Sequence, residues 1–254
     1  MLLVALAAIF GLGIGSFLNV VIHRVPHRQS VVSPRSACPG CGTTLAERDN
    51  IPVFSWLLLK GRCRTCGMRI SPRYPLVELA TAVLFGAVAA RLGADWALPA
   101  FCLFFAALLA IALIDLEHFI VPNRIVFPML AISLPLLATA ALLDGEVRPL
   151  VTGVVGALIA SNGLLLLNLV NPRGMGMGDV KLALLLGLFL GWLSLGHVAL
   201  GLFLGFLFGA IGGILLISLG LKTRKDPVPF APFLAAGTVV AVLAGNALLD
   251  RYPV

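Results

Sequence analysis

Charged side chains are scarce in this sequence: Asp, Glu, Lys and Arg make up 11% of its 254 residues, while 60% of the residues are hydrophobic. A soluble domain of this length carries about a quarter charged residues, so a soluble protein is excluded. The alternation of apolar and polar residues that typifies membrane β-barrel strands is also lacking. The apolar residues instead form long uncharged runs, which predicts an all-α polytopic membrane protein.

Eight membrane-spanning helices are expected, because each crossing of a bilayer needs about 20 mainly apolar residues. One uncharged stretch, Leu182–Leu221, is long enough for two helices with a turn near Gly196–His197. Glycines recur there at every fourth position, which indicates close helix packing; they are Gly201, Gly205, Gly209 and Gly213. The other six helices are expected at Leu2–Ile22, Leu76–Ala90, Trp96–Ile114, Ile125–Leu143, Pro149–Asn171 and Phe230–Leu249.

The first apolar run has no basic residues before it, and Arg24 and Arg28 follow it directly. A cleaved signal peptide has basic residues at its start, so we expect a retained helix. The chain then divides into a first transmembrane helix (1–22), a loop (23–75) and a membrane core of seven helices (76–254).

Basic residues are divided unevenly between the two sides of the predicted bundle. With eight helices, fifteen of the 18 Lys and Arg lie on the side of the loop 23–75, and Arg91, Arg148 and Arg251 lie on the other. Cytoplasmic segments of membrane proteins are enriched in Lys and Arg. We therefore expect the loop to be cytoplasmic and both termini to face outward. The same rule explains the basic loop without a nucleic-acid partner.

Cysteines are few, and four of the five lie in the loop as two Cys-x-x-Cys pairs, Cys38 with Cys41 and Cys63 with Cys66. Two such pairs can supply four thiolates to one tetrahedral zinc ion. A disulfide or a redox site is the alternative, but a cytoplasmic loop is kept reduced and no βαβ pattern surrounds either pair. We predict a structural zinc ion here, and we expect Cys102, inside an apolar run, to be a packing residue.

Two acids lie at the edges of apolar runs, where ionisable side chains are costly and therefore informative. Asp115 ends one run, and Asp179 begins another after Gly176 and Gly178. Both acids are expected at the cytoplasmic side, where the glycines could adopt positive φ angles and let an extended peptide approach. The alternative is that Asp179 is only a helix N-cap and that Asp115 pairs with Arg124. Composition does not decide between these interpretations.

Several further segments occur in a distinctive order along the chain: Gly15–Pro26, the two Cys-x-x-Cys pairs, Asn50–Pro52, Ser55–Leu57, Arg73–Glu78, the Asp115 segment, Gly176–Asp179 and Pro229–Phe233. This ordered set closely resembles the type IV prepilin peptidases, which are bifunctional leader peptidases and N-methyltransferases of bacterial inner membranes. The resemblance implies that Asp115 and Asp179 are the pair of a Gly-x-Gly-Asp aspartyl protease. The four loop cysteines match the bifunctional branch of the family.

The resemblance also implies the substrates and the two reactions. Type IV prepilins or type II secretion pseudopilins would be cut after a glycine that ends a short basic leader. One aspartate, as a carboxylate, would take a proton from water, while the other, protonated, would donate to the scissile carbonyl. The new N-terminal amine would then be methylated from S-adenosylmethionine. His118, three residues from Asp115, is expected to face solvent.

No glycine-rich signature for a nucleotide cofactor is present, so the residues that bind S-adenosylmethionine are not indicated. Glu47, Asp49 and Glu78 are candidates because they are acids in an otherwise basic region, but they could equally balance neighbouring arginines. Two other classes of function stay open at this point. One is a proton-coupled transporter, which also places carboxylates at membrane depth, and the other is a non-catalytic scaffold for pilus assembly.

Overall fold

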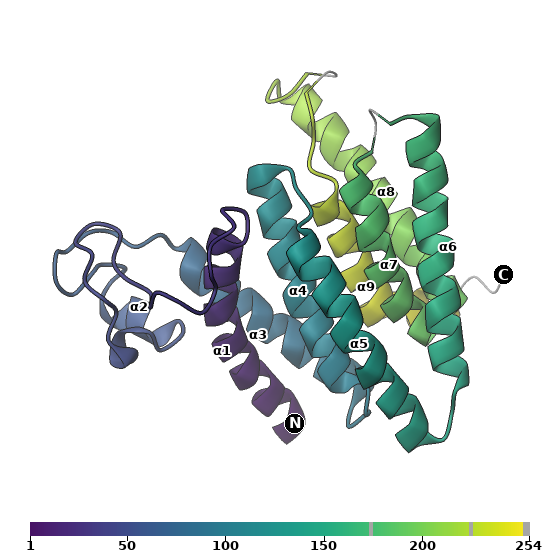
Figure 1. Cartoon of the computed structure of the whole chain (residues 1–254), viewed down its shortest axis with the longest axis horizontal. Coiled ribbons are helices and arrows are strands. Elements are labelled where there is room, and N and C mark those ends of the chain that lie inside the picture. The colour runs from purple at the N-terminus through teal and green to yellow at the C-terminus, as the bar shows by residue number, and fades with distance from the viewer. Residues whose placement is uncertain (173–174, 224–225, 251–254) are drawn as a thin grey trace. The chain divides into compact units, whose positions relative to one another are not determined.

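The computed structural model describes residues 1–172, 175–223 and 226–250, and in these ranges it contains helices and loops but no β-strand (Figure 1). Eight helices are long: α1 (Leu2–Arg24), α3 (Arg73–Leu92), α4 (Leu98–His118), α5 (Asn123–Asp144), α6 (Arg148–Val170), α7 (Met177–Leu193), α8 (Leu195–Ser218) and α9 (Ala231–Leu249). Each of the six shorter predicted runs overlaps one of them, and the run Leu182–Leu221 overlaps both α7 and α8. The predicted class, an all-α polytopic membrane protein, is confirmed.

Seven of these helices are long and apolar enough to cross a membrane. The exception, α7, has 17 residues and is about 25 Å long, and most of its side chains are buried. The stretch Leu182–Leu221 contains most of α7 and all of α8, so it forms two helices as predicted, but the turn is at Ser194 and not at Gly196–His197. Ser194 ends α7 and caps α8, because its hydroxyl accepts the N–H of His197 at 3.3 Å. The serine therefore supplies the turn that the sequence suggested for the glycine.

The chain forms two compact units, and the first covers residues 1–94. Its helices α1 and α3 lie side by side (Figure 1). A Cβ atom added at Gly15 would lie 2.6 Å from the Cα atom of Glu78, so the two backbones approach closely there because Gly15 lacks a side chain. The residues between the two helices form a short 3-10 helix, η1 (Glu47–Asp49), and a five-residue helix, α2 (Phe54–Leu58).

The second unit, residues 95–254, contains α4 to α9. Close backbone contacts pair its helices: a Cβ atom at Gly156 of α6 would lie 2.6 Å from the carbonyl oxygen of Gly187 in α7. In the core, the rings of Phe104 and Phe189 stack with centroids 4.1 Å apart and join α4 to α7. Such small-residue contacts are the usual means of helix association in lipid.

The predicted glycine stripe on α8 is confirmed at three of its four positions. Gly201 and Gly205 face leucine side chains, and Gly209 faces Phe230. The prediction is wrong for Gly213, which has no neighbour within 4 Å of an added Cβ, whereas a Cβ at Gly212 would meet the ring of Phe233 at 2.6 Å. The cause is the 100° turn per helical residue, which rotates a strict four-residue repeat gradually away from its partner.

Candidate functional site

Asp115 lies in the last turn of α4 and is buried, with 5% of its surface exposed. Its Oδ2 atom accepts the N–H of Ala231, the first residue of α9, at 3.1 Å. The first N–H groups of a helix have no partner within the helix, and they lie at the positive end of its dipole. Asp115 is thus bonded to the start of α9, and the predicted alternative, an ion pair with the exposed Arg124, is not formed among the described residues.

Asp179 is buried in the first turn of α7. Its Oδ2 atom accepts the N–H of Gly176 at 3.3 Å, and its own N–H donates to the Gly176 carbonyl oxygen at 3.1 Å. Gly176 is therefore the N-cap of α7 and Asp179 is its third helical residue, so the alternative that made Asp179 itself the N-cap is wrong. A glycine has no side chain to cap with, and the acid supplies the bond instead.

The structure brings these two acids together although α4 and α7 are far apart in sequence. The carboxyl groups of Asp115 and Asp179 are close enough for a direct Coulombic interaction. The stack of Phe104 on Phe189 holds the same two helices in contact. Two buried carboxyl groups whose charges interact and that each accept an N–H at the start of a helix are a pair that can move protons to and from a water molecule.

The two glycines before Asp179 do not have the backbone angles that the sequence suggested. Neither has a positive φ angle, and Gly176 is extended with φ −76° and ψ 145°. A Cβ atom at Gly178 would lie 2.9 Å from the Cβ of Val121, in the connection between α4 and α5. At Gly178 the absence of a side chain is therefore required by packing and not by the backbone angles. Gly176 is exposed, and a Cβ atom there would lie in ordinary contact with the Oδ2 atom of Asp179, at 3.4 Å.

Sequence reasoning missed the role of the Ala231 N–H group at this site. Pro229–Phe233 carried part of the family resemblance, but a main-chain donor leaves no mark on a sequence. His118 is exposed, as predicted, and its Nε2 atom lies 3.9 Å from a carboxylate oxygen of Glu117. Lys181, two residues after Asp179 in α7, donates from its Nζ atom to the Asn123 side-chain oxygen at 3.2 Å.

The four loop cysteines form a second candidate site, in the first unit. Their Sγ atoms all lie within 4.8 Å of one another, and those of Cys38 and Cys66 are 3.7 Å apart. Sulfur atoms at about 2.3 Å from a tetrahedral zinc ion are separated by about 3.8 Å. All four cysteines are free, so neither pair forms a disulfide. The donor set and its spacing fit a zinc ion.

The two Cys-x-x-Cys pairs have the same backbone structure. In each, the N–H of a following glycine donates to the carbonyl of the first cysteine: Gly42 to Cys38 at 2.8 Å and Gly67 to Cys63 at 2.9 Å. Both glycines have positive φ angles, 69° and 70°, which favour glycine because other residues are strained there. The matching turns direct the four sulfur atoms to one point.

The thiols of the cluster differ in acidity. A hydrogen bond between its Sγ atom and the Thr43 hydroxyl is the main cause that lowers the pKa of Cys41 to about 6. At Cys66, a hydrogen bond from the Met68 backbone lowers the pKa of the thiol. Desolvation and the neighbouring thiols raise it and outweigh that bond, so that the pKa is about 11. The cluster thus resists full deprotonation by itself, and a cation among the sulfur atoms would offset the charge of four thiolates.

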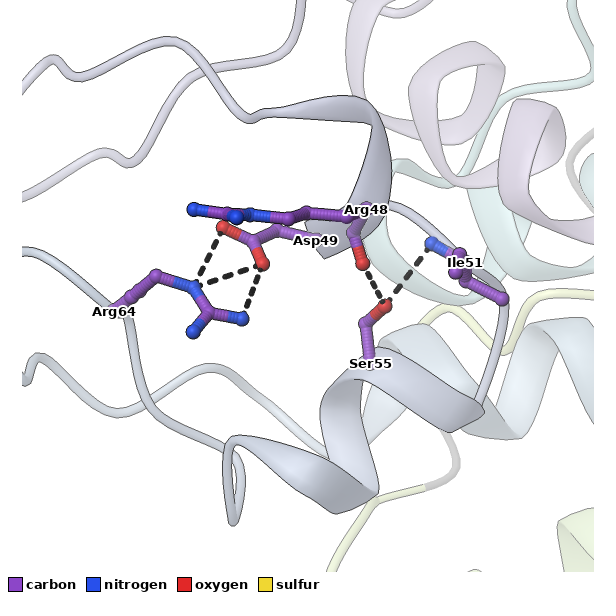
Figure 2. Close-up of polar contacts among 5 residues, drawn as sticks. All are labelled: Arg48, Asp49, Ile51, Ser55 and Arg64. Atoms are coloured by element: carbon purple, nitrogen blue, oxygen red, sulfur yellow. Dashed lines mark hydrogen bonds and ion pairs between the residues drawn. The ribbon is translucent and has the colours of Figure 1, made fainter.

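The candidate acids for S-adenosylmethionine occupy three different environments. Asp49 forms a two-pronged ion pair with Arg64, with nitrogen to oxygen distances of 2.7 to 3.1 Å (Figure 2). Glu78 is buried in α3, and its Oε2 atom accepts the N–H of Val53 at 2.7 Å. Glu47 is exposed in η1. Asp49 therefore balances an arginine, as the alternative interpretation held, and Glu78 anchors the loop to α3.

Comparison with known proteins gives two family matches. Residues 9–92 match the bacterial peptidase A24 N-terminal domain, and residues 102–217 match the type IV leader peptidase family. The first match lies in the unit with the four cysteines and the second covers both acids.

Curated relatives cover nearly the whole chain. A prepilin leader peptidase/N-methyltransferase of Bacillus subtilis (strain 168) is 38% identical over 96% of this chain and 95% of its own length. The protein of the same name from Aeromonas salmonicida (strain A449) is 39% identical over 98% of this chain and 93% of its own. The protein of the same name from Pseudomonas aeruginosa is 37% identical over 96% of this chain and 91% of its own length. No solved structure matches the chain.

Proposed function

Because the chain belongs to the type IV leader peptidase family, we propose that it cleaves the basic leader from type IV prepilins or pseudopilins after a glycine. We further propose that it methylates the new N-terminal amine with S-adenosylmethionine as methyl donor. The observation that carries the proposal is the pair of buried acids, Asp115 and Asp179, which interact from two helices that are distant in sequence.

The two acids act as one unit in the proposed cleavage. One, as a carboxylate, takes a proton from a water molecule that attacks the scissile carbonyl carbon. The other, which is protonated, donates a hydrogen bond to the carbonyl oxygen and later gives its proton to the leaving amine. The bond from the Ala231 N–H to Asp115 and that from the Gly176 N–H to Asp179 hold the carboxyl groups in position. No covalent intermediate with the protein is formed.

The cleavage point of the substrate lies between its basic leader and its apolar helix. This point is at the membrane surface. Both acids lie near helix ends, Asp115 at the end of α4 and Asp179 at the start of α7. The distribution of Lys and Arg supports a cytoplasmic orientation of these ends in the bacterial inner membrane; Arg173, Arg224, Lys225 and Arg251, which enter that count, lie outside the described residues. We assign the exposed Gly176 to substrate contact and Gly178 to packing against Val121.

Zinc at Cys38, Cys41, Cys63 and Cys66 has a structural role in this proposal. A site closed by four thiolates leaves no open position for a substrate or a water molecule, so the metal supplies folding free energy and not chemistry. S-adenosylmethionine supplies the methyl group. Of the three candidate acids, Glu47 is exposed and is the one whose carboxylate takes part in no described ion pair or hydrogen bond.

Mass spectrometry of reaction products tests the proposed function. The purified protein, in lipid vesicles and with its metal, is incubated with a synthetic prepilin peptide with and without S-adenosylmethionine. We expect leader and mature peptide in both reactions, and one added methyl group on the mature peptide only with the cofactor. An intact peptide in both would overturn the proposal, as expected for a transporter or a scaffold, and cleavage without methylation would overturn its second part.

A further inference from the structure

The short helix α2 exposes apolar side chains on one side. Phe54, Leu57 and Leu58 are 56%, 60% and 65% exposed, and Ile51, three residues before the helix, is 48% exposed. Spacings of three and four residues place Phe54, Leu57 and Leu58 on the same face of α2, and the exposed Ile51 lies just before the helix in the chain. We call these four residues the α2 face. Large apolar side chains gathered in this way mark a surface that contacts another apolar phase or molecule.

The orientation of the α2 face is fixed by the residues that point the other way. Ser55 is buried; its hydroxyl donates to the Arg48 carbonyl at 2.7 Å and accepts the N–H of Ile51 at 3.1 Å (Figure 2). Trp56 donates its indole N–H to the Ile70 carbonyl at 3.1 Å. With these two side chains bonded inward, Phe54, Leu57 and Leu58 are held outward.

The start of α2 is fixed at the depth of a membrane-spanning helix. The Val53 N–H donates to Glu78 at 2.7 Å, and Glu78 is the sixth residue of α3, a helix that is long and apolar enough to cross a membrane. At 1.5 Å per residue, Glu78 lies about 7 Å along the helix from its first residue. Val53 is thus placed at or just below the end of a membrane span.

The backbone at Val53 is strained, which indicates that contacts around it hold the start of α2 in place. Its φ and ψ angles are 62° and −50°, and the Phe54 N–H donates to the Pro52 carbonyl at 2.6 Å, which closes a γ-turn. This turn is rare and strained, above all for a β-branched residue, and it persists only where its surroundings enforce it. The carboxylate of Glu78 enforces it by binding the Val53 N–H.

Exposed basic residues lie on both sides of the α2 face in the sequence. Arg48, Lys60 and Arg62 are exposed, whereas Asp49 is already paired with Arg64. An apolar face with Lys and Arg beside it is the arrangement of interfacial membrane segments, because anionic headgroups attract the cations while the apolar side chains enter the acyl boundary.

We propose that the α2 face lies in the headgroup and acyl boundary of the bilayer that α1 and α3 cross, on the anionic leaflet. The segment between these two helices is then attached to the membrane at three places: the end of α1, the start of α3 and the α2 face. Its metal site is held beside the membrane surface and not at the end of a free loop.

Photocrosslinking from position 57 tests this proposal. The full chain, with its metal, carries p-benzoylphenylalanine in place of Leu57 and is reconstituted in vesicles of phosphatidylethanolamine and phosphatidylglycerol. After irradiation, mass spectrometry identifies the partner of the benzophenone. We expect adducts with lipid acyl chains. The matched control replaces Thr65, which is exposed within the second cysteine pair, and is expected to give few lipid adducts.

Three results would overturn the proposal. Crosslinks from position 57 to residues 95–254 would show that the α2 face packs on the other unit of the same chain. Crosslinks to a second copy, visible as a covalent dimer, would show that it is an interface between protomers. Equal lipid labelling at positions 57 and 65 would show no selective insertion. An unchanged zinc content in both variants verifies that the segment is folded when the crosslinks are made.

Discussion

The segment 25–72 and the unit 95–254 are held together by different means. In the segment, Cys38, Ser55, Gly61 and Cys63 are the only buried residues, and the fold depends on backbone turns, one ion pair and four converging thiols. In the unit 95–254, helices meet backbone to backbone at glycines around a core of stacked phenylalanines. The segment should therefore respond to metal and charge, and the helical unit to side-chain volume.

The largest expected effect concerns chemistry in the helical unit. Asp115→Asn and Asp179→Asn should each lower the rate of peptide cleavage by at least about 100-fold, because general acid and base catalysis contributes that much or more. The double variant should be scarcely slower than either single one, since groups that act as one unit are not additive. The measurement is the rate of leader release from a prepilin peptide.

Methylation and metal content serve as controls for this experiment. Both aspartate variants should still methylate a peptide that has already been cleaved, and should keep their zinc, because neither carboxyl group belongs to the segment 25–72. Substantial cleavage by either folded variant would show that the pair is structural and would remove the main chemical difference between the two regions.

Metal loss is expected to affect the segment alone. Cys63→Ser should lower the zinc content per chain and speed proteolysis within 25–72, because three thiolates bind zinc more weakly than four and the segment has little apolar core. Proteolysis of the helical unit should be unchanged. The matched control is Cys102→Ala, which alters a buried thiol of α4 and should leave the zinc content intact. Full zinc content in Cys63→Ser would contradict the assignment of this ligand.

Side-chain volume should have the converse effect. Gly156→Ala places a methyl group 2.6 Å from the Gly187 carbonyl oxygen, and we expect it to destabilise the helical unit by about 1 to 3 kcal/mol through overpacking. Gly163→Ala is the matched control in the same helix, since a Cβ there meets nothing within 4 Å. Thermal unfolding in detergent compares the two, and the zinc content should not change in either. Equal melting temperatures would mean that α6 and α7 are not as closely packed as described.

The sequence predicted features that depend on local composition. Long apolar runs gave the eight helices, and spacing alone gave the four clustered cysteines, because two Cys-x-x-Cys turns need little else to direct their thiols. The edges of apolar runs also marked both Asp115 and Asp179. What could not be predicted depends on contacts between distant segments: the N–H of Ala231 reaches Asp115 across 116 positions.

Two further misses have the same physical cause. Gly178 was expected to be needed for its backbone angles, but it is needed because Val121 packs on it, and only the folded chain places that valine there. The γ-turn at Val53 is contrary to the conformational preference of valine, so the sequence around Val53 does not predict it. It exists because Glu78, in α3, binds its N–H group. The least predictable residues are thus those whose role depends on a partner that is distant in the sequence.

The smallest effect is expected at the ion pair between Asp49 and Arg64, because the Arg64 side chain is 50% exposed and solvent screens the pair from that side. The Arg64 guanidinium holds the pKa of the Asp49 carboxyl below its usual range. A lowered folded-state pKa means that the contribution of the pair is complete above the unfolded value of about 4 and is lost only as the pH falls through the folded value. Between pH 6 and 8, Asp49 should therefore give no pH dependence at all.

Asp49→Asn mimics the protonated acid at neutral pH. The effect of the ion pair can then be measured without lowering the pH, which would also protonate the thiolates. Because Arg64 lies between Cys63 and Cys66, freeing it should loosen the second cysteine turn and modestly speed zinc transfer to a chromogenic chelator. Added salt should reduce the difference from the unaltered protein, since it screens exposed charges. Glu47→Gln removes a neighbouring exposed acid and should leave the rate unchanged. If Asp49→Asn and Glu47→Gln release zinc equally fast, the pair does not brace the metal site, and only the backbone turns and the metal hold the segment.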